Sequence, residues 1–125
     1  MIFVNFKTYE QGTGEKAIEL AKMCQEVEKE TGVKIVPIVQ AADIFQIAAL
    51  GIEVWAQHVD DAELGQHTGM IPPKAVADDG AGGVLLNHSE DKLNFETILI
   101  CKVLKYPMQS RNAQNTHLRM SHPKI

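Results

Sequence analysis

The chain has 125 residues, of which 45% are hydrophobic and 22% charged, as in ordinary soluble globular domains. No apolar run approaches the roughly 20 residues that a membrane helix needs, and the four-residue opening run is too short for a signal peptide. We therefore expect a cytoplasmic protein without a membrane partner. Cys24 and Cys101 form no CxxC pair, so buried, reduced thiols are expected rather than a disulfide.

Charge is distributed unevenly along the chain. Residues 1–93 hold seven lysines against fifteen acidic residues, whereas residues 94–125 hold five basic residues against Glu96 alone. This break predicts a folded part, 1–93, and a divergent basic tail, 94–125, explained by a shifted reading frame, a degenerate fragment of a longer gene, or disorder. The basic charges of the tail are not clustered, so nucleic acid is not expected as a partner.

The first part alternates strand-like and helix-like segments. Residues 1–4 predict a strand, and a loop over residues 8–14 follows it. Thr13 is predicted to cap a helix that Gly32 ends. Apolar residues at helical spacing give this helix one buried stripe, made of Ala17, Leu20, Ala21, Cys24 and Val27.

Two more strands frame a short helix. The β-branched run 33–39 predicts a strand covered on both faces, with Pro37 weakening its pairing. Asp43 is predicted to cap the helix, and Gly51 to end it. Its inward positions are Ile44, Ile47 and Ala48. Residues 53–58 predict the third strand.

A long polar loop over residues 59–71 precedes a third helix, which is expected at 74–79 after two prolines. Residues 82–87 predict the fourth strand. Strands that alternate with helices predict parallel pairing with right-handed crossovers, which is the α/β class. Periodicity leaves open whether the sheet is flat or curls into part of a barrel.

The tail has weaker signals. Residues 94–105 can be drawn as a helix, or as a β-rich run over 97–100. No periodicity follows residue 107, and disorder is the default expectation there.

Polar side chains follow the first and fourth strands. Asn5 and Lys7 share one face, because side chains alternate along a strand, and they emerge together at its end. An ammonium held at this place predicts an anionic ligand. His88 leaves the fourth strand before Ser89 and Glu90, which suit a helix N-terminus. Such a terminus disfavours the imidazolium and would leave a neutral ring that can donate a hydrogen bond to a carbonyl.

Two other patterns predict no site. The glycine-rich residues 80–83 precede a strand, whereas a phosphate loop follows one, so a tight turn is expected. The acidic loop has no metal-ligand spacing, although it contains Asp60, Asp61, Glu63 and His67. We expect neither a metal nor a cofactor.

Four segments together resemble one enzyme family. Residues 4–9, 56–58, 65–69 and 85–90 read VNFKTY, AQH, GQHTG and LLNHSE. In this order, at strand ends, they resemble triosephosphate isomerase, and specifically its shorter archaeal-type branch. The resemblance covers about residues 1–93, and it implies the first four βα units of the eight in a TIM barrel of roughly 250 residues.

The resemblance implies roles for the strand-end residues. Asn5 and Lys7 would bind the triose phosphate, and Lys7 and His88 would be catalytic as dihydroxyacetone phosphate and glyceraldehyde 3-phosphate interconvert through an enediolate. Glu90 would pair with Lys7, and Ser89 would help to begin a helix. Triosephosphate isomerase is itself the established example of a histidine kept neutral by a helix N-terminus.

Further implications concern assembly and activity. Thr68 and Gly69 lie in the loop that reaches a neighbouring subunit in this family, with Gln57 supporting it, so a homo-oligomer is expected. The family's general base, a glutamate after the sixth strand, and its later phosphate loops have no match in this chain. We therefore expect the chain to be inactive alone. The alternative is a non-catalytic half-barrel that associates with itself or with a partner.

Overall fold

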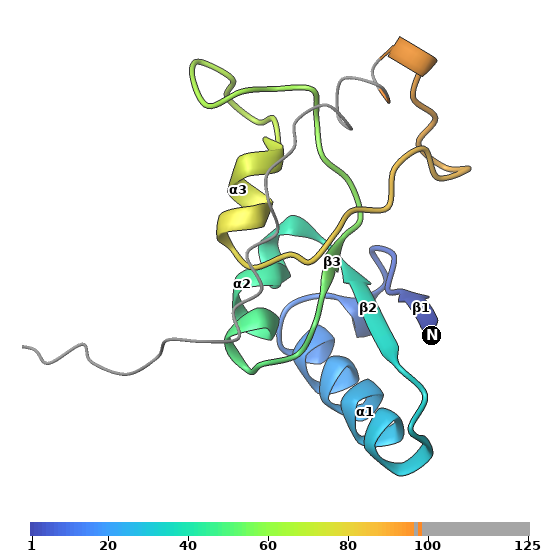
Figure 1. Cartoon of the computed structure of the whole chain (residues 1–125). Coiled ribbons are helices and arrows are strands. Elements are labelled where there is room, and N and C mark those ends of the chain that lie inside the picture. The colour runs from blue at the N-terminus through green and yellow to red at the C-terminus, as the bar shows by residue number, and fades with distance from the viewer. Residues whose placement is uncertain (97, 99–125) are drawn as a thin grey trace, which may run out of the picture.

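A parallel sheet with helices between its strands organises the chain. The computed structural model describes residues 1–96 and 98. In this part the strands stand in the order β1-β2-β3, and the predicted α/β class is confirmed (Figure 1). The strands are β1 (Ile2–Asn5), β2 (Ile35–Val39) and β3 (Trp55–Ala56). The helices are the 3-10 turn η1 (Glu10–Gly12), α1 (Glu15–Thr31), α2 (Ala41–Ala49) and α3 (Pro73–Asp78).

The start of α1 differs from the prediction. Its N-cap is Gly14, with φ 61°, and no side chain caps it. The Thr13 hydroxyl donates instead to the backbone oxygen of Tyr9, 2.9 Å away, which closes the preceding turn. The predicted end is confirmed: Gly32 has φ 69°, and its N–H donates to the carbonyl of Glu28.

The predicted stripe of α1 is buried only in its first half. Ala17 and Ala21 are fully buried against the sheet, while Leu20 and Cys24 are partly buried. Val27 is 45% exposed, because the last turns of α1 extend past the strands (Figure 1). Cys24 is a free thiol, and burial raises its pKa.

The centre of the molecule is a core between α1, α2 and one face of the sheet. Ile44 and Ile47 of α2 are fully buried, as predicted, and Ala48 is partly buried. Pro37 lies in the central strand. Successive residues of β2 form their hydrogen bonds alternately with β1 and with β3, and Pro37 is on the β3 side. Because β3 pairs only with the last two residues of β2, the N–H that Pro37 lacks would point to a residue before β3 begins, so no strand hydrogen bond is lost. The core residues include Phe6, Val39, Val54, Ala56, Val59 and Val76.

Asp43 does not cap α2, contrary to the prediction. The helix begins at Ala41 after Gln40, and Asp43 lies in the first turn, only 4% exposed. Its Oδ1 accepts the N–H of Gly14 at 3.1 Å. The carboxylate therefore connects the start of α2 to the start of α1.

The other face of the sheet carries aromatic rings. Phe3 and Trp55 lie with centroids 4.7 Å apart and planes tilted by 50°. Val36 and Ile38 share this face with them, because paired residues of parallel strands point the same way. A Cβ on Gly83 would lie 2.5 Å from the Trp55 indole, so only glycine fits beside the ring.

The segment predicted as a fourth strand is only partly paired. Residues 82–85 run parallel to β3 through three backbone hydrogen bonds, with one bridge, between Ala56 and Val84. In the described part of the chain, residues 82–87 therefore do not form a full strand. The polar loop 59–71 and the helix after Pro72 are confirmed, with Pro73 as the first residue of α3. The predictions for residues 99–125 lie outside the described residues.

Candidate active site

Lys7 stands at the end of β1 in a left-handed backbone conformation, with φ 55°. Two side chains hold it there. The Oδ1 of Asn5 accepts the N–H of Lys7 at 2.9 Å, and the Nε2 of Gln57 donates to its carbonyl oxygen at 2.8 Å. This backbone conformation is strained for a residue with a Cβ, and the two hydrogen bonds to the Lys7 backbone hold it in place.

The ammonium of Lys7 meets two groups from the end of the 82–87 segment. Its Nζ lies 2.5 Å from Oε2 of Glu90 and 3.4 Å from Nε2 of His88. The side chain of Lys7 is 26% exposed, that of His88 32% and that of Glu90 67%, so the cluster lies at the surface with the carboxylate outermost. The structure thus brings together the lysine, histidine and glutamate singled out from the sequence.

Both ring nitrogens of His88 have contacts within the cluster. Its Nδ1 lies 3.4 Å from Oε2 of Glu90, and the backbone N–H of Glu90 points to the same nitrogen at 3.4 Å. A neutral ring accepts at one nitrogen and donates at the other. A proton on Nδ1 allows a donation to the Glu90 carboxylate, whereas a bare Nδ1 accepts from the Glu90 N–H. With either arrangement, Lys7 contacts both His88 and Glu90.

Residues 88–91 form a turn, so the predicted helix start at Ser89 and Glu90 is wrong. The N–H of Asp91 donates to the carbonyl of His88 at 2.9 Å. Asn87, with φ 58°, accepts the N–H of Leu93 through its side chain and so shapes the turn. The helix-terminus argument for a neutral His88 therefore has no basis in this arrangement.

Charge at the site favours ionised Glu90. The hydrogen bond from Lys7 lowers the pKa of Glu90 from its ordinary value, with smaller contributions from the charges of Lys7 and His88. A lysine beside an imidazole, with a carboxylate behind it, can present positive charge and a titratable ring to one anionic ligand.

A second histidine, to which the sequence assigned no role, lies near the site. His58, just after β3, lies with Nε2 3.1 Å from Oδ1 of Asp60 and Nδ1 3.0 Å from Oδ2 of Asp91. The pair with Asp60 could be suspected from their spacing. Asp91 is remote in sequence, and only the parallel order of the strands brings it there.

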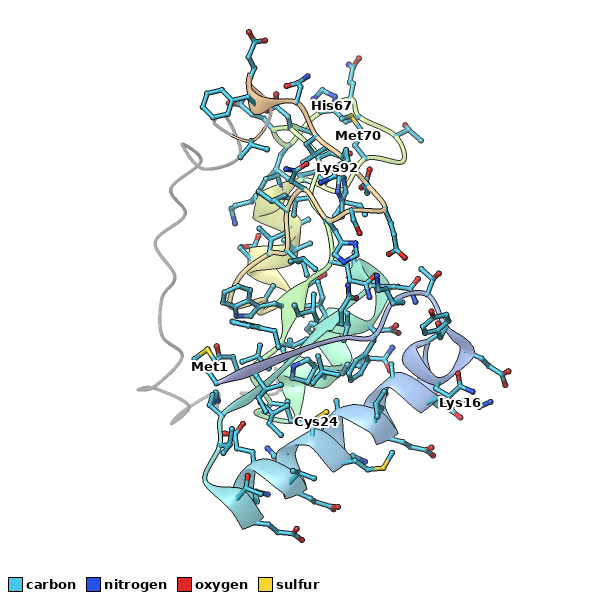
Figure 2. All side chains as sticks on the ribbon, turned by 90° about the vertical axis from the view of Figure 1, so that its right-hand side faces the viewer. Met1, Lys16, Cys24, His67, Met70 and Lys92 are labelled. Carbon is cyan, nitrogen blue, oxygen red and sulfur yellow. The ribbon has the colours of Figure 1, made fainter. Side chains whose placement is uncertain are left out.

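The residues predicted at a subunit interface have different surroundings in the structure. Thr68 and Gly69 are exposed in the loop after β3, and Gly69 has φ 89°. His67 and Met70 of this loop lie at the same end of the molecule as Lys92 (Figure 2). Gln57 instead contacts the Lys7 backbone.

None of the helices in residues 1–96 is long and apolar enough to cross a membrane, and no group of three potential metal ligands occurs in this part.

Comparison with known proteins places the chain in a family. The triosephosphate isomerase family model matches residues 1–110. A triosephosphate isomerase of Methanobacterium bryantii is 48% identical over 94 residues, which are 74% of this chain and 42% of that protein. That of Sulfurisphaera tokodaii is 44% identical over 99 residues, 78% and 43% of the two chains.

The matched segment covers most of this chain but less than half of each relative. A relative from Methanothermus fervidus is 42% identical over 106 residues, 84% of this chain and 47% of its own. The chain thus spans less than half the length of the curated relatives it matches, and its parallel strands and helices correspond to part of a TIM barrel. The chain belongs to the triosephosphate isomerase family.

Proposed function

We propose that this chain carries part of a triosephosphate isomerase site, for the interconversion of dihydroxyacetone phosphate and D-glyceraldehyde 3-phosphate through an enediolate. The observation that carries the proposal is the cluster in which the Lys7 ammonium lies 3.4 Å from the His88 ring and is paired with Glu90. One oxygen atom can lie within hydrogen-bonding distance of both nitrogens, as stabilisation of a developing enediolate oxygen requires.

Each residue has a separate part in this proposal. Lys7 supplies the positive charge that attracts the anionic substrate. His88 donates to and accepts from the substrate oxygens, for which Nε2 must carry a proton and its contact with Lys7 must open. Asn5 meets the substrate with its Nδ2 group, since its Oδ1 binds the Lys7 N–H. Glu90 balances the ammonium, and Ser89 belongs to the turn that orients His88.

We further propose that the 125-residue chain is inactive alone. The carboxylate of this cluster, Glu90, is paired with Lys7 and is not free to remove a proton from carbon. Loss of a general base lowers rates by about 10²- to 10⁴-fold. The base and the phosphate-binding loops would have to be supplied from outside these 125 residues.

Complementation tests the proposal. The purified chain is mixed with a polypeptide covering the part of the Methanobacterium bryantii relative that the match leaves out, and isomerisation is followed in a coupled assay. We expect activity in the mixture and none in either component. Replacement Lys7→Met should abolish it, while Lys22→Met, an exposed lysine on α1, should not. Activity of the isolated chain would refute its proposed inactivity, and equal activity of the Lys7→Met mixture would refute the site.

A binding experiment tests the site without turnover. Dihydroxyacetone phosphate is titrated into the labelled chain, and the His88 ring and Lys7 ammonium signals are followed by nuclear magnetic resonance. Both should move with one saturation curve. Signals that stay fixed at millimolar substrate would count against this cluster as the site.

A cytoplasmic homo-oligomer is the proposed assembly, and exposed Thr68 and Gly69 support a loop contact between subunits. The alternative function is a non-catalytic half-barrel that associates with itself or a partner. Its support is β1, an edge strand of the described sheet, on which Ile2 and Phe3 are 51% and 45% exposed. Sedimentation analysis of Phe3→Lys and Thr68→Lys distinguishes the two contacts, because only the replacement at the true interface should dissociate the oligomer.

A further inference from the structure

We propose that His58 is a positioning residue, which in its doubly protonated form holds the turn 88–91 against the end of β3. The role of the turn in a catalytic site rests on the proposed function, but the connection itself does not. It joins the turn that supplies His88 and Glu90 to the end of β3, where Gln57 holds the backbone of Lys7.

The geometry requires two donors on one ring. Both nitrogens of His58 face carboxylate oxygens, Asp60 at 3.1 Å and Asp91 at 3.0 Å. A carboxylate only accepts hydrogen bonds when it is ionised, and a neutral imidazole has only one N–H. The imidazolium is therefore the form that satisfies both contacts, and its charge strengthens both.

The two carboxylates differ in how firmly they are held. Asp60 is 29% exposed, and its Oδ2 also accepts the N–H of Ile71 at 2.6 Å, so it is fixed to the base of its loop. Asp91 is 65% exposed and lies in the turn after His88. Since one side of the ring is anchored, loss of the second proton should release the Asp91 side.

Release of Asp91 would affect the site through the backbone that joins Asp91 to Glu90 and His88. Asp91 directly follows Glu90, and its N–H donates to the carbonyl of His88. A turn that is no longer attached to β3 would give Glu90 and His88 more freedom relative to Lys7, which is fixed from the other direction by Asn5 and Gln57. The charged groups that face the His58 ring are Asp60 from the loop after β3 and Asp91 from the turn.

Nuclear magnetic resonance of the full chain tests the proposal. The ring-nitrogen signals of His58 and the backbone amide signals are followed between about pH 5 and pH 8, the range in which histidine normally titrates. We expect both ring nitrogens of His58 to carry protons at the acid end. The amide signals of Glu90 and Asp91 should follow the titration curve of His58. In His58→Gln they should lose that dependence and take positions near those of the wild type at high pH.

Matched variants separate positioning from general folding. His67→Gln changes an exposed histidine of the neighbouring loop and should leave the titration of the Asp91 amide unchanged. Asp91→Asn keeps an acceptor for one N–H and removes the charge, so its turn should resemble the wild type more closely than that of Asp91→Ala. Signals of β1 and α1 residues that stay unchanged show that each variant is folded.

Two results would overturn the inference. One is a His58 ring with a single proton while the Asp91 amide keeps its acid-form position. The other is a titration of the Glu90 and Asp91 amides that persists in His58→Gln. A failure of isomerase complementation with an intact His58 titration would refute the proposed function and leave the connection standing.

Discussion

The side-chain amide of Gln57 donates a hydrogen bond of 2.8 Å to the backbone carbonyl of Lys7, and the same nitrogen lies 3.3 Å from the carbonyl of Ile38. The end of β3 thereby holds the ends of β1 and β2. Because Lys7 adopts φ 55°, this hydrogen bond fixes a strained residue at the centre of the proposed site.

Replacement Gln57→Ala should lower the free energy of unfolding by about 1–3 kcal/mol, because it leaves a partly buried carbonyl without its donor. Urea unfolding followed by circular dichroism measures the change. The control is Gln46→Ala, an exposed position on α2, where the change should stay within about 0.5 kcal/mol. Equal effects of the two replacements would show that the Lys7 hydrogen bond contributes no stability.

The left-handed backbone conformation of Lys7 should lower the free energy of unfolding. Both Lys7→Gly and Lys7→Met lose the pairing with Glu90, but only glycine adopts φ 55° without strain. A left-handed residue with a Cβ costs roughly 1–2 kcal/mol, and the greater freedom of unfolded glycine offsets about half of this. Lys7→Gly should therefore unfold at higher urea concentration than Lys7→Met. A less stable glycine variant would contradict strain at this position.

The positions of the site residues could be predicted because they depend on a simple rule. Carboxyl ends of parallel strands meet at one end of the sheet, so Lys7 and His88 come together although they are far apart in sequence. Their catalytic roles stay predictions. The predicted cap at Asp43 was wrong for a different reason: its carboxylate accepts the N–H of Gly14 at the start of α1, and such a tertiary contact has no local signal.

Other features depend on packing that periodicity does not record. The turn at 88–91 is shaped by Asn87 with its positive φ and by contacts to His58, whereas Ser89 and Glu90 alone favour a helix start. The 82–87 segment is apolar enough for a strand, but only part of it pairs with β3. Local preference was therefore a good guide to α1 and α3 and a poor one to the turn.

The acid side of the stability profile should depend on Asp60. The N–H of Ile71, and after it His58, lowers the pKa of this carboxyl below its ordinary value. A carboxylate whose pKa is lower in the folded than in the unfolded chain stabilises the fold at pH values above its unfolded-state pKa. This stabilisation is lost as the pH falls through its folded-state pKa. Unfolding free energies should thus decline below about pH 4 more steeply in the wild type than in Asp60→Asn.

The neighbouring Asp61 provides the control for that measurement. It is exposed, and Asp61→Asn should leave the steepness of the acid decline unchanged. An Asp60→Asn profile parallel to the wild type would contradict the proposed contribution of the Ile71 hydrogen bond.

Gly83 should be intolerant of any side chain, because the indole of Trp55 occupies the space that a Cβ needs. A Cβ at Gly83 would lie 2.5–2.8 Å from three atoms of the ring, which is much shorter than a normal van der Waals contact. Gly83→Ala must displace the ring or the 82–85 segment and should lower the free energy of unfolding by about 1–3 kcal/mol. Trp55 is the single tryptophan of the chain, so its fluorescence reports the displacement directly. Gly65→Ala is the matched control, since its Cβ would meet only the His67 ring at 3.7 Å. An unchanged spectrum and stability in Gly83→Ala would show that the indole does not pack against this segment in solution.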